Sequence, residues 1–288
     1  MSVGSRLGPW VGSAALLAIA FVGCTLLEPL DGFSEPPDAL DGALEATSAD
    51  SSATDAAAPT DGGADVLTPI DAGPFCARVD ASFCEDFDDP IEASRWSLST
   101  VQKAAHGIDD AAFTSAPLSL FARTNTLVTG ESAASYRRVD FPSRMSSVTY
   151  AFDLRVDTRA QSEFLVAAAG LVDPAGVTYS ASIVLGDTSD MVEEAREGVM
   201  PSMYADHVLG MRVPDGRWTR VSVSMTKRNQ GGFDLLVTLD GQPVASTPLG
   251  LWAGITGGTP YITIGSAYIA GPSAPWAIRI DSLTVDMK

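Results

Sequence analysis

The chain has 288 residues, of which 45% are hydrophobic and 8% aromatic, and its formal net charge is -18 at pH 7. This length and composition suffice for one large hydrophobic core or two small ones. The excess of acidic over basic side chains repels phosphate backbones and disfavours nucleic acid as a partner.

The first 23 residues have the layout of an exported leader. Met1 to Arg6 is short and carries one positive charge, and residues 14–22, "AALLAIAFV", form the densest apolar run. The alternative is a transmembrane helix, but this run is well short of the roughly 18 apolar residues that span a bilayer. The pattern therefore predicts a signal peptide over residues 1–23.

The end of this apolar run carries a short motif. Phe21, Val22, Gly23 and Cys24 resemble the lipobox of bacterial lipoproteins. In that family the chain is cut before the cysteine, which then takes lipid on its sulfur and its new amine. The resemblance implies lipidation of Cys24 and a membrane partner through that anchor. Thr25, in place of an aspartate, implies by the same resemblance the outer membrane of the cell envelope.

Residues 24–75 are predicted to be a disordered tether. Beyond Cys24 this segment contains eleven acids, no Lys or Arg, and much Ala, Ser, Thr and Pro. Such a composition cannot bury enough apolar surface to offset the entropy of ordering. Its reach is about 40 Å as a random coil and about 170 Å when extended. It is therefore expected to hold a folded domain, residues 76–288, away from a membrane.

The two remaining cysteines stand close together in "FCARVDASFCEDFDD". An exported chain enters an oxidising compartment, where Cys76 and Cys84 are expected to form a disulfide at the start of the domain. The alternative is a metal site, for which only His106 and His207 are available as further nitrogen ligands.

From Cys76 onward the hydrophobic period is two, which indicates strands. "SVTYAFDLRVD" places Val148, Tyr150, Phe152, Leu154 and Val156 on one face, and "RWTRVSVSM" and "FDLLVTLDGQPV" alternate in the same way. The dipeptide Asp240-Gly241 predicts a hairpin turn. "MVEEAREG" is assigned as a strand rather than a helical turn. About ten strands without a long helix predict an all-β antiparallel sandwich or barrel.

Several of these segments carry a resemblance in their order. "FCEDFDD" followed by Trp96, then "SLFAR", "DGRWTRVSVSM", "FDLLVTLDGQPV", "YITIGSAYI" and "AIRIDSLTVDM" resemble the laminin-G-like members of the concanavalin A-like lectin/glucanase superfamily. The resemblance covers nearly all of residues 76–288. It implies a jelly-roll sandwich of two antiparallel sheets, one concave and often facing the ligand.

The motifs of the enzymes in this superfamily are missing. Glucanases need paired carboxylates on one strand, typical of Glu-x-Asp-x-Glu, and the nearest string is "EEARE" with Glu193, Glu194 and Glu197 at the wrong spacing. Alginate lyases of the superfamily would need a Gln-x-His element. No catalytic residue is therefore assigned, although acids distant in sequence can still converge.

Two kinds of binding site have candidate residues. Trp252 and Trp276 lie in Gly/Pro-rich loops, where an aromatic ring can offer its face to a sugar. The alternative is that both rings cap the sandwich edges, while Trp96 and Trp218 are expected in the core.

The superfamily resemblance also implies a structural calcium ion. Glu85, Asp86 and Asp281 occupy the first-strand and last-strand regions that hold it, and hard oxygen ligands suit Ca²⁺. The alternative is that these are solvated acids at strand ends.

Together these features predict a membrane-anchored, surface or periplasmic binding module that recognises a polysaccharide or an envelope protein. Two other hypotheses stay open. One is that the domain is a structural envelope protein without a sugar site, and the other is that it is a divergent glycoside hydrolase or lyase. An aromatic row in a groove would favour the binding module, and an exposed apolar patch would favour the structural protein. A close pair of carboxylates would favour the hydrolase or lyase.

Overall fold

The computed structural model describes residues 75–88, 96, 98–142, 145–255 and 257–288. This part of the chain contains fifteen strands and a turn of 3-10 helix, η1 (Phe75–Arg78), and no α-helix. Among these residues nothing helical is long and apolar enough to cross a bilayer. Cys24 and the boundaries predicted at residues 23/24 and 75/76 fall outside or at the edge of the described ranges, so leader, anchor and tether stay predictions.

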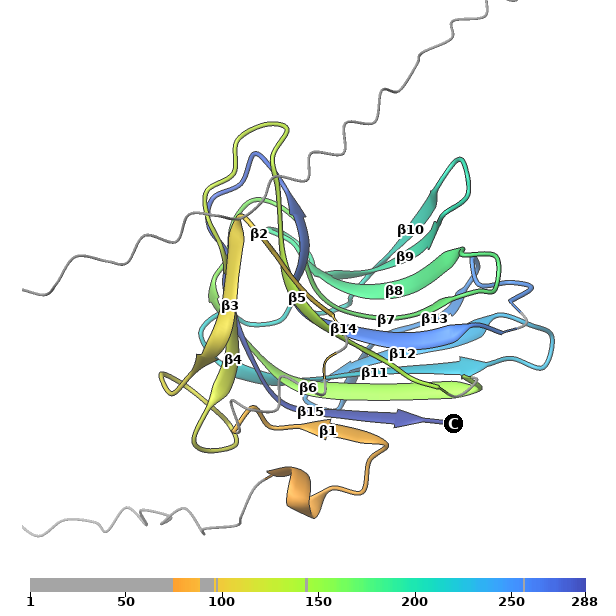
Figure 1. Cartoon of the computed structure of the whole chain (residues 1–288), viewed down its shortest axis with the longest axis horizontal. Helices are drawn as coiled ribbons and strands as arrows, with labels where there is room; N and C mark the ends of the chain where they lie inside the picture. The colour runs from red at the N-terminus through yellow and green to blue at the C-terminus, as the bar shows by residue number, and fades with distance from the viewer. Residues whose placement is uncertain (1–74, 89–95, 97, 143–144, 256) are drawn as a thin grey trace, which may run out of the picture. The chain divides into compact units, whose positions relative to one another are not determined.

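The strands form two antiparallel sheets, which face one another in Figure 1. The eight-stranded sheet runs in the order β13 (Gln242–Leu249), β12 (Phe233–Leu239), β11 (Trp218–Lys227), β6 (Ser147–Thr158), β15 (Ala277–Met287), β4 (Ser119–Thr124) and β3 (Ala104–Asp109), with β1 (Phe83–Glu85) paired to β15. The seven-stranded sheet runs in the order β10 (Met203–Val208), β9 (Met191–Glu197), β8 (Thr178–Leu185), β7 (Phe164–Val172), β14 (Thr259–Ala270), β5 (Ser132–Asp140) and β2 (Leu98–Gln102). The predicted all-β sandwich is confirmed.

Alternating side chains of the central strands build the core between the sheets. The five predicted inward residues of β6, from Val148 to Val156, are fully buried, and Thr219, Val221, Val223 and Met225 of the neighbouring β11 are buried beside them. The apolar side chains of one sheet thus leave water by packing against those of the other, which is the main stabilising contribution to a sandwich.

The predicted hairpin joins β12 to β13. Asp240 and Gly241 have φ angles of 48° and 78°, and positive φ at both turn residues is what a tight hairpin of right-handed twist requires. Asp240 also fixes the turn from the side, because its carboxylate accepts a hydrogen bond from the backbone N–H of Arg220 at 2.8 Å. The Asp-Gly signal is therefore confirmed.

The start of the domain is closed by the predicted disulfide. Cys76 in η1 and Cys84 in β1 are bonded, with their Cα atoms 5.6 Å apart. The assignment of "MVEEAREG" to a strand is also confirmed, as β9. Trp96 is buried as expected, but the prediction for Trp218 is wrong. This residue opens β11 one position before buried Thr219, so alternation places it on the outer face, where it is half-buried.

Candidate functional site

The two tryptophans proposed to stack on a sugar are part of the core instead. Trp252 and Trp276 are both 0% exposed. Trp276 stacks on Phe164 with ring centroids 4.9 Å apart, and Trp252 packs edge-on against Phe233 at 5.2 Å and tilted against Tyr179. Neither ring presents a face to solvent, so their assignment as ligand-binding residues is wrong, and both rings are buried in the core.

Two polar side chains of the sandwich, those of Glu194 and Ser162, hold the loops of these tryptophans by hydrogen bonds. The carboxylate of Glu194, which is 1% exposed, accepts hydrogen bonds from the backbone N–H groups of Gly250, Leu251 and Trp252. On the other loop, the indole N–H of Trp276 donates to Ser162 Oγ at 3.1 Å. Glycine and proline in a loop sequence indicate turns, but they do not indicate that an acceptor far away in the sequence holds the loop against the core.

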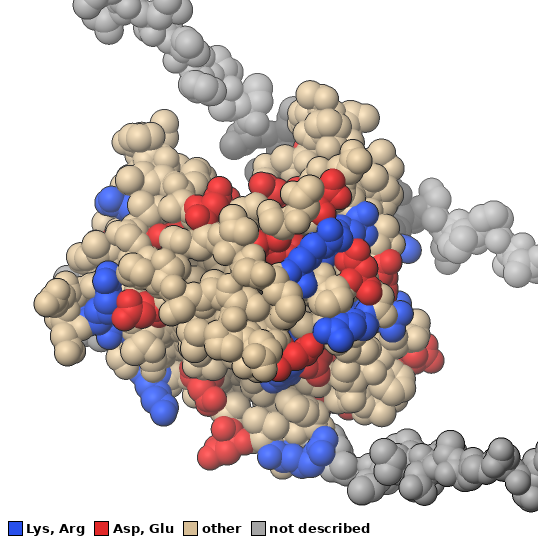
Figure 2. Space-filling model, turned by 180° about the vertical axis from the view of Figure 1, so that it is seen from behind, with Lys and Arg blue, Asp and Glu red and all other residues tan. Residues whose placement is uncertain are grey.

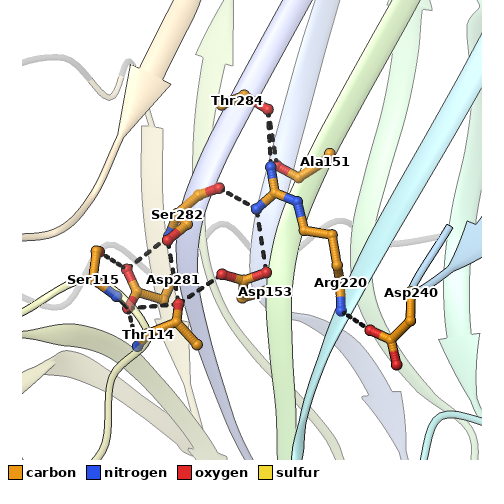
Figure 3. Close-up of polar contacts among 9 residues, drawn as sticks. All are labelled: Thr114, Ser115, Ala151, Asp153, Arg220, Asp240, Asp281, Ser282 and Thr284. Carbon is orange, nitrogen blue, oxygen red and sulfur yellow. Dashed lines mark hydrogen bonds and ion pairs between the residues drawn. The ribbon is translucent and has the colours of Figure 1, made fainter. Parts of the chain in front are cut away.

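Asp281, a candidate calcium ligand, has its carboxylate occupied by the protein. Its two oxygens accept hydrogen bonds from the backbone N–H groups of Thr114, Ser115 and Ser282 and from the hydroxyl of Ser115 (Figure 3). Burial raises the pKa of Asp281, while these hydrogen bonds act in the opposite direction. The carboxylate thus anchors the β3–β4 loop to β15.

The other two calcium candidates do not join Asp281 in a cluster. Glu85 Oε1 accepts from the backbone N–H of Phe87, and Asp86 accepts from the backbone N–H groups of Cys76 and Asp88. Among the described residues there is no group of three or more His, Cys, Asp or Glu side chains placed to hold a metal ion. The calcium ion that the resemblance implies therefore stays a prediction, and no function is derived from it.

An open groove lies on the outer face of the seven-stranded sheet. This face forms the bottom of a hollow between two raised parts of the molecule. The raised parts are the β9–β10 hairpin and the loops around β5 and β14, both at the top of Figure 1. Acidic side chains gather along the hollow in Figure 2. The groove encloses about 400 Å³ over β7, β8, β9 and β14. We call it the Tyr268 groove; it is lined by Gln161, Glu163, Leu165, Val184, Glu193, Tyr268 and Ala270.

Two irregularities in the sheet meet at this groove. The register of β14 shifts between Ile264 and Tyr268, and that of β7 against β8 shifts between Leu165 and Ala167. Tyr268 and Leu165 are cross-strand partners, and Tyr268 remains 52% exposed. Bulges bend a strand and change where its side chains point, and they are frequent beside binding sites. Here they leave an aromatic ring standing in the groove.

The electrostatics of the groove come from acids. Glu163 and Glu193 line it, and the described lining residues include no Arg, Lys or His. The pKa of Glu193 is raised, first by burial and then by the negative charges of Asp206, Glu163 and Glu197. The site therefore combines an aromatic ring, an apolar floor and carboxylates whose charge is not balanced by a lining cation.

A second aromatic residue of the same sheet face, Tyr261, is buried. The guanidinium of Arg138 lies 3.9 Å from the ring centroid of Tyr261, and this tyrosine is 6% exposed. Burial raises the pKa of Tyr261 to about 12, so its hydroxyl stays protonated near neutral pH. Tyr261 forms part of the floor of the hollow and is not suited to act as a general base.

Sequence reasoning missed the residues of the Tyr268 groove. Tyr268 stands in the predicted strand "YITIGSAYI", and a glycine inside a strand pattern, here Gly265, is the signal that announces a bulge. Gly265 has a φ of 113°, and a Cβ atom there would lie 2.8 Å from the carbonyl oxygen of Ser135. Glu193 belongs to the string "EEARE", but the spacing of acids within this strand cannot predict that Glu193 lies in one groove with Glu163, which comes from another segment.

No protein-family model matches the sequence, and neither does any curated protein. Solved structures with a similar fold do exist. The endo-beta-1,4-glucuronan lyase of the fungus Trichoderma reesei superposes with a TM-score of 0.56 at 14% identity, over 73% of this chain and 96% of that one. The cellulose induced protein Cip1 superposes with a TM-score of 0.52 at 12% identity, over 72% of this chain and 97% of that one. The marine PL-14 alginate lyase from Aplysia kurodai superposes with a TM-score of 0.51 at 9% identity, over 73% of this chain and 100% of that one.

At these identities the similarity concerns the fold alone. The described part of the chain is an all-β jelly roll of two antiparallel sheets, as the sequence resemblance implied. Its assignment to the laminin-G-like branch stays a prediction.

Proposed function

We propose that this domain is a glycan-binding module that holds a polysaccharide chain in the Tyr268 groove. The observation that carries the proposal is the half-exposed ring of Tyr268, which two bulges place over an apolar floor in an open groove. A tyrosine ring can cover the apolar face of a sugar while its hydroxyl and the nearby Gln161 and Glu163 hydrogen-bond to sugar hydroxyls. Structural neighbours named as lyases of glucuronan and alginate support a role connected with glycans.

A substitution series tests the groove. The full chain carrying Cys24→Ser, which avoids lipid, is titrated with a panel of polysaccharides by calorimetry, with and without EDTA. Tyr268→Ala should weaken binding by about tenfold or more, as expected for loss of a stacked ring. Phe113→Ala serves as the matched control because Phe113 is 40% exposed and does not line the groove. Equal affinity of the Tyr268→Ala variant and the parent would refute this site.

A lyase is the second candidate, favoured by the names of the structural neighbours. Elimination from a uronate requires a base for the ring proton and groups that neutralise the sugar carboxylate. The described lining of the groove offers Tyr268 but no histidine and no cation, and His207 points instead to Glu194 in the sandwich, with 3.3 Å between Nε2 and Oε2. Ultraviolet absorbance of unsaturated products on glucuronan or alginate, lost in Tyr268→Phe, would favour catalysis over binding.

Contact with an envelope protein is the third candidate and rests on the edge strand β10. Met203, Tyr204 and Val208 of this strand are 44%, 54% and 64% exposed. An exposed apolar edge strand is able to pair with a strand of a partner. Light scattering should show an assembly larger than one chain if the partner is a second copy, and Val208→Lys should disperse it.

We further propose that the domain is displayed from the outer membrane by lipid on Cys24 and the acidic segment behind it. Two or three acyl chains make such an anchor stable, whereas one is marginal. Replacing Cys24 by Ser should move the protein from the membrane fraction to the soluble fraction. Retention in the membrane fraction would contradict the lipobox assignment.

A further inference from the structure

We propose that the Tyr268 groove selects polysaccharides whose sugars carry protonated amino groups, such as polymers of glucosamine, over polyuronates and fully N-acetylated chains. This inference rests on the proposed function, because it names the class of glycan that the same groove holds. It separates this chain from the substrates named for its structural neighbours, which are anionic.

The first support is the charge balance of the groove. Glu163 and Glu193 are the ionisable acids of its lining, and no lining residue is cationic. Neither carboxylate forms a hydrogen bond or an ion pair with another residue of the described ranges, whereas several other acids of the domain surface are paired with an arginine, as Asp157 is with Arg155 and Arg279. Both groove carboxylates are therefore available to a ligand.

The second support is an unfavourable strand pairing. Glu193 of β9 lies directly opposite Asp206 of β10 in the antiparallel register. Like charges in directly opposed positions destabilise a sheet. Burial and these neighbouring acids also raise the pKa of Glu193, which means that the folded protein holds this negative charge at a cost. A bound cation would offset the repulsion between these carboxylates.

The third support is the position of the ring. Tyr268 and Glu193 line the same groove, with Leu165 and Val184 between them on the intervening strands β7 and β8. A sugar stacked on the ring would direct its substituents along the groove, where an ammonium group can form a charge-assisted hydrogen bond with a carboxylate. The face of a tyrosine also attracts cations. The same acids would repel the carboxylate that each residue of a polyuronate carries.

The test compares three oligomers of equal length on one protein. The full chain with Cys24→Ser is titrated by calorimetry with hexamers of glucosamine, of N-acetylglucosamine and of mannuronate, below the pKa of the sugar amine. We expect the glucosamine hexamer to bind about tenfold more tightly than the acetylated one, and the mannuronate hexamer to bind least. Glu193→Gln should remove most of the preference for the amine, because it should weaken binding of the glucosamine hexamer far more than binding of the acetylated one.

Controls separate this inference from the proposed function. Asp286→Asn removes one negative charge from an exposed position on β15 in the other sheet, and should leave the preference intact. Tyr268→Ala should weaken the glucosamine and acetylated hexamers alike. Hexalysine tests whether charge alone suffices and should bind far more weakly than the glucosamine hexamer.

The outcomes are distinct. Equal binding of the amine and the acetylated sugar, with loss of both in Tyr268→Ala, would overturn the selectivity and leave the glycan site standing. Tightest binding of the mannuronate hexamer would also overturn it. Binding of hexalysine as tight as that of the sugar amine would reduce the effect to net charge and overturn it as well. Absence of binding to every hexamer would refute the proposed function itself.

Discussion

Glu194 shows how one buried carboxylate determines the path of a loop. It accepts hydrogen bonds from three successive backbone N–H groups, those of residues 250–252, and lies within 3.3 Å of His207 Nε2. The side chain points into the sandwich from β9, whereas Glu193 next to it points into the groove. Neighbouring acids of one strand thus have different roles because alternation sends them to opposite faces.

Replacement of Glu194 by Ala is predicted to destabilise the domain strongly. The change leaves three backbone N–H donors, one buried and two part-buried, without their acceptor, and such a loss costs on the order of 1–3 kcal/mol for a buried donor. We expect the free energy of unfolding to fall by about 3 kcal/mol or more in urea denaturation. Glu194→Gln keeps one carbonyl acceptor and should lose less. A similar stability of the Ala variant and the parent would contradict the role of this carboxylate.

At the scale of elements, the bulge in β14 is predicted to depend on Gly265. Its φ of 113° is unfavourable for any other residue, and an added Cβ would meet the carbonyl oxygen of Ser135 at 2.8 Å. Gly265→Ala should therefore lower stability and shift Tyr268, so that affinity for the glycan falls together with the midpoint of unfolding. Gly250→Ala is the control, since no atom lies within 4 Å of a Cβ built there and its φ is not in the left-handed region.

The disulfide joins η1 to β1, a short strand that pairs with β15 at the margin of the eight-stranded sheet. The two cysteines are 8 positions apart, and closing so short a loop in the unfolded chain contributes about 2–3 kcal/mol. A Cys76→Ser, Cys84→Ser double variant should lose stability of this order in urea and should expose β1 amides to hydrogen exchange. Adding reductant should lower the stability of the parent to that of the variant and should not affect the variant.

The strands could be predicted from the sequence because they depend on local alternation. The faces of β6, the Asp-Gly hairpin and the strand β9 follow from residues within each segment. Trp252 and Trp276 could not be placed in this way, because their burial depends on Glu194 and Ser162, which lie far away in the sequence. Loop composition indicates only that the chain turns, whereas long-range hydrogen bonds determine against which part of the domain the loop packs.

At the scale of the whole molecule, the groove is assembled from four separate parts of the chain. Its lining comes from residues 161–165, 184, 193 and 268–270, which the strand order β9-β8-β7-β14 places side by side. No single segment carries a recognisable motif. The sequence resemblance could therefore imply the two sheets, but the residues of the site depend on sheet order and on two register shifts that a pattern of period two does not encode.

Acids with raised pKa values make the stability of the whole domain depend on pH in an unusual direction. The pKa of Asp88 is raised to about 6, chiefly by burial and also by the charges of Asp86 and Asp281, although a hydrogen bond from the backbone N–H of Leu118 acts against this. Burial likewise raises the pKa of Asp281. A carboxyl group with a pKa higher in the folded than in the unfolded chain is bound to more protons in the folded state, so this contribution to stability grows as pH falls.

The expected result is a free energy of unfolding that increases when the pH is lowered from about 7 to about 5, because Asp88 is then protonated in the folded chain and still ionised in the unfolded one. Urea denaturation at a series of pH values measures it. Asp88→Asn keeps the oxygen that accepts from Leu118 N and removes the titration, so its stability should vary less over this interval and exceed that of the parent at pH 7. Parallel curves for the two proteins would show that Asp88 does not contribute, and the remaining slope would then belong to Asp281 and to the reduction of the net charge of -18.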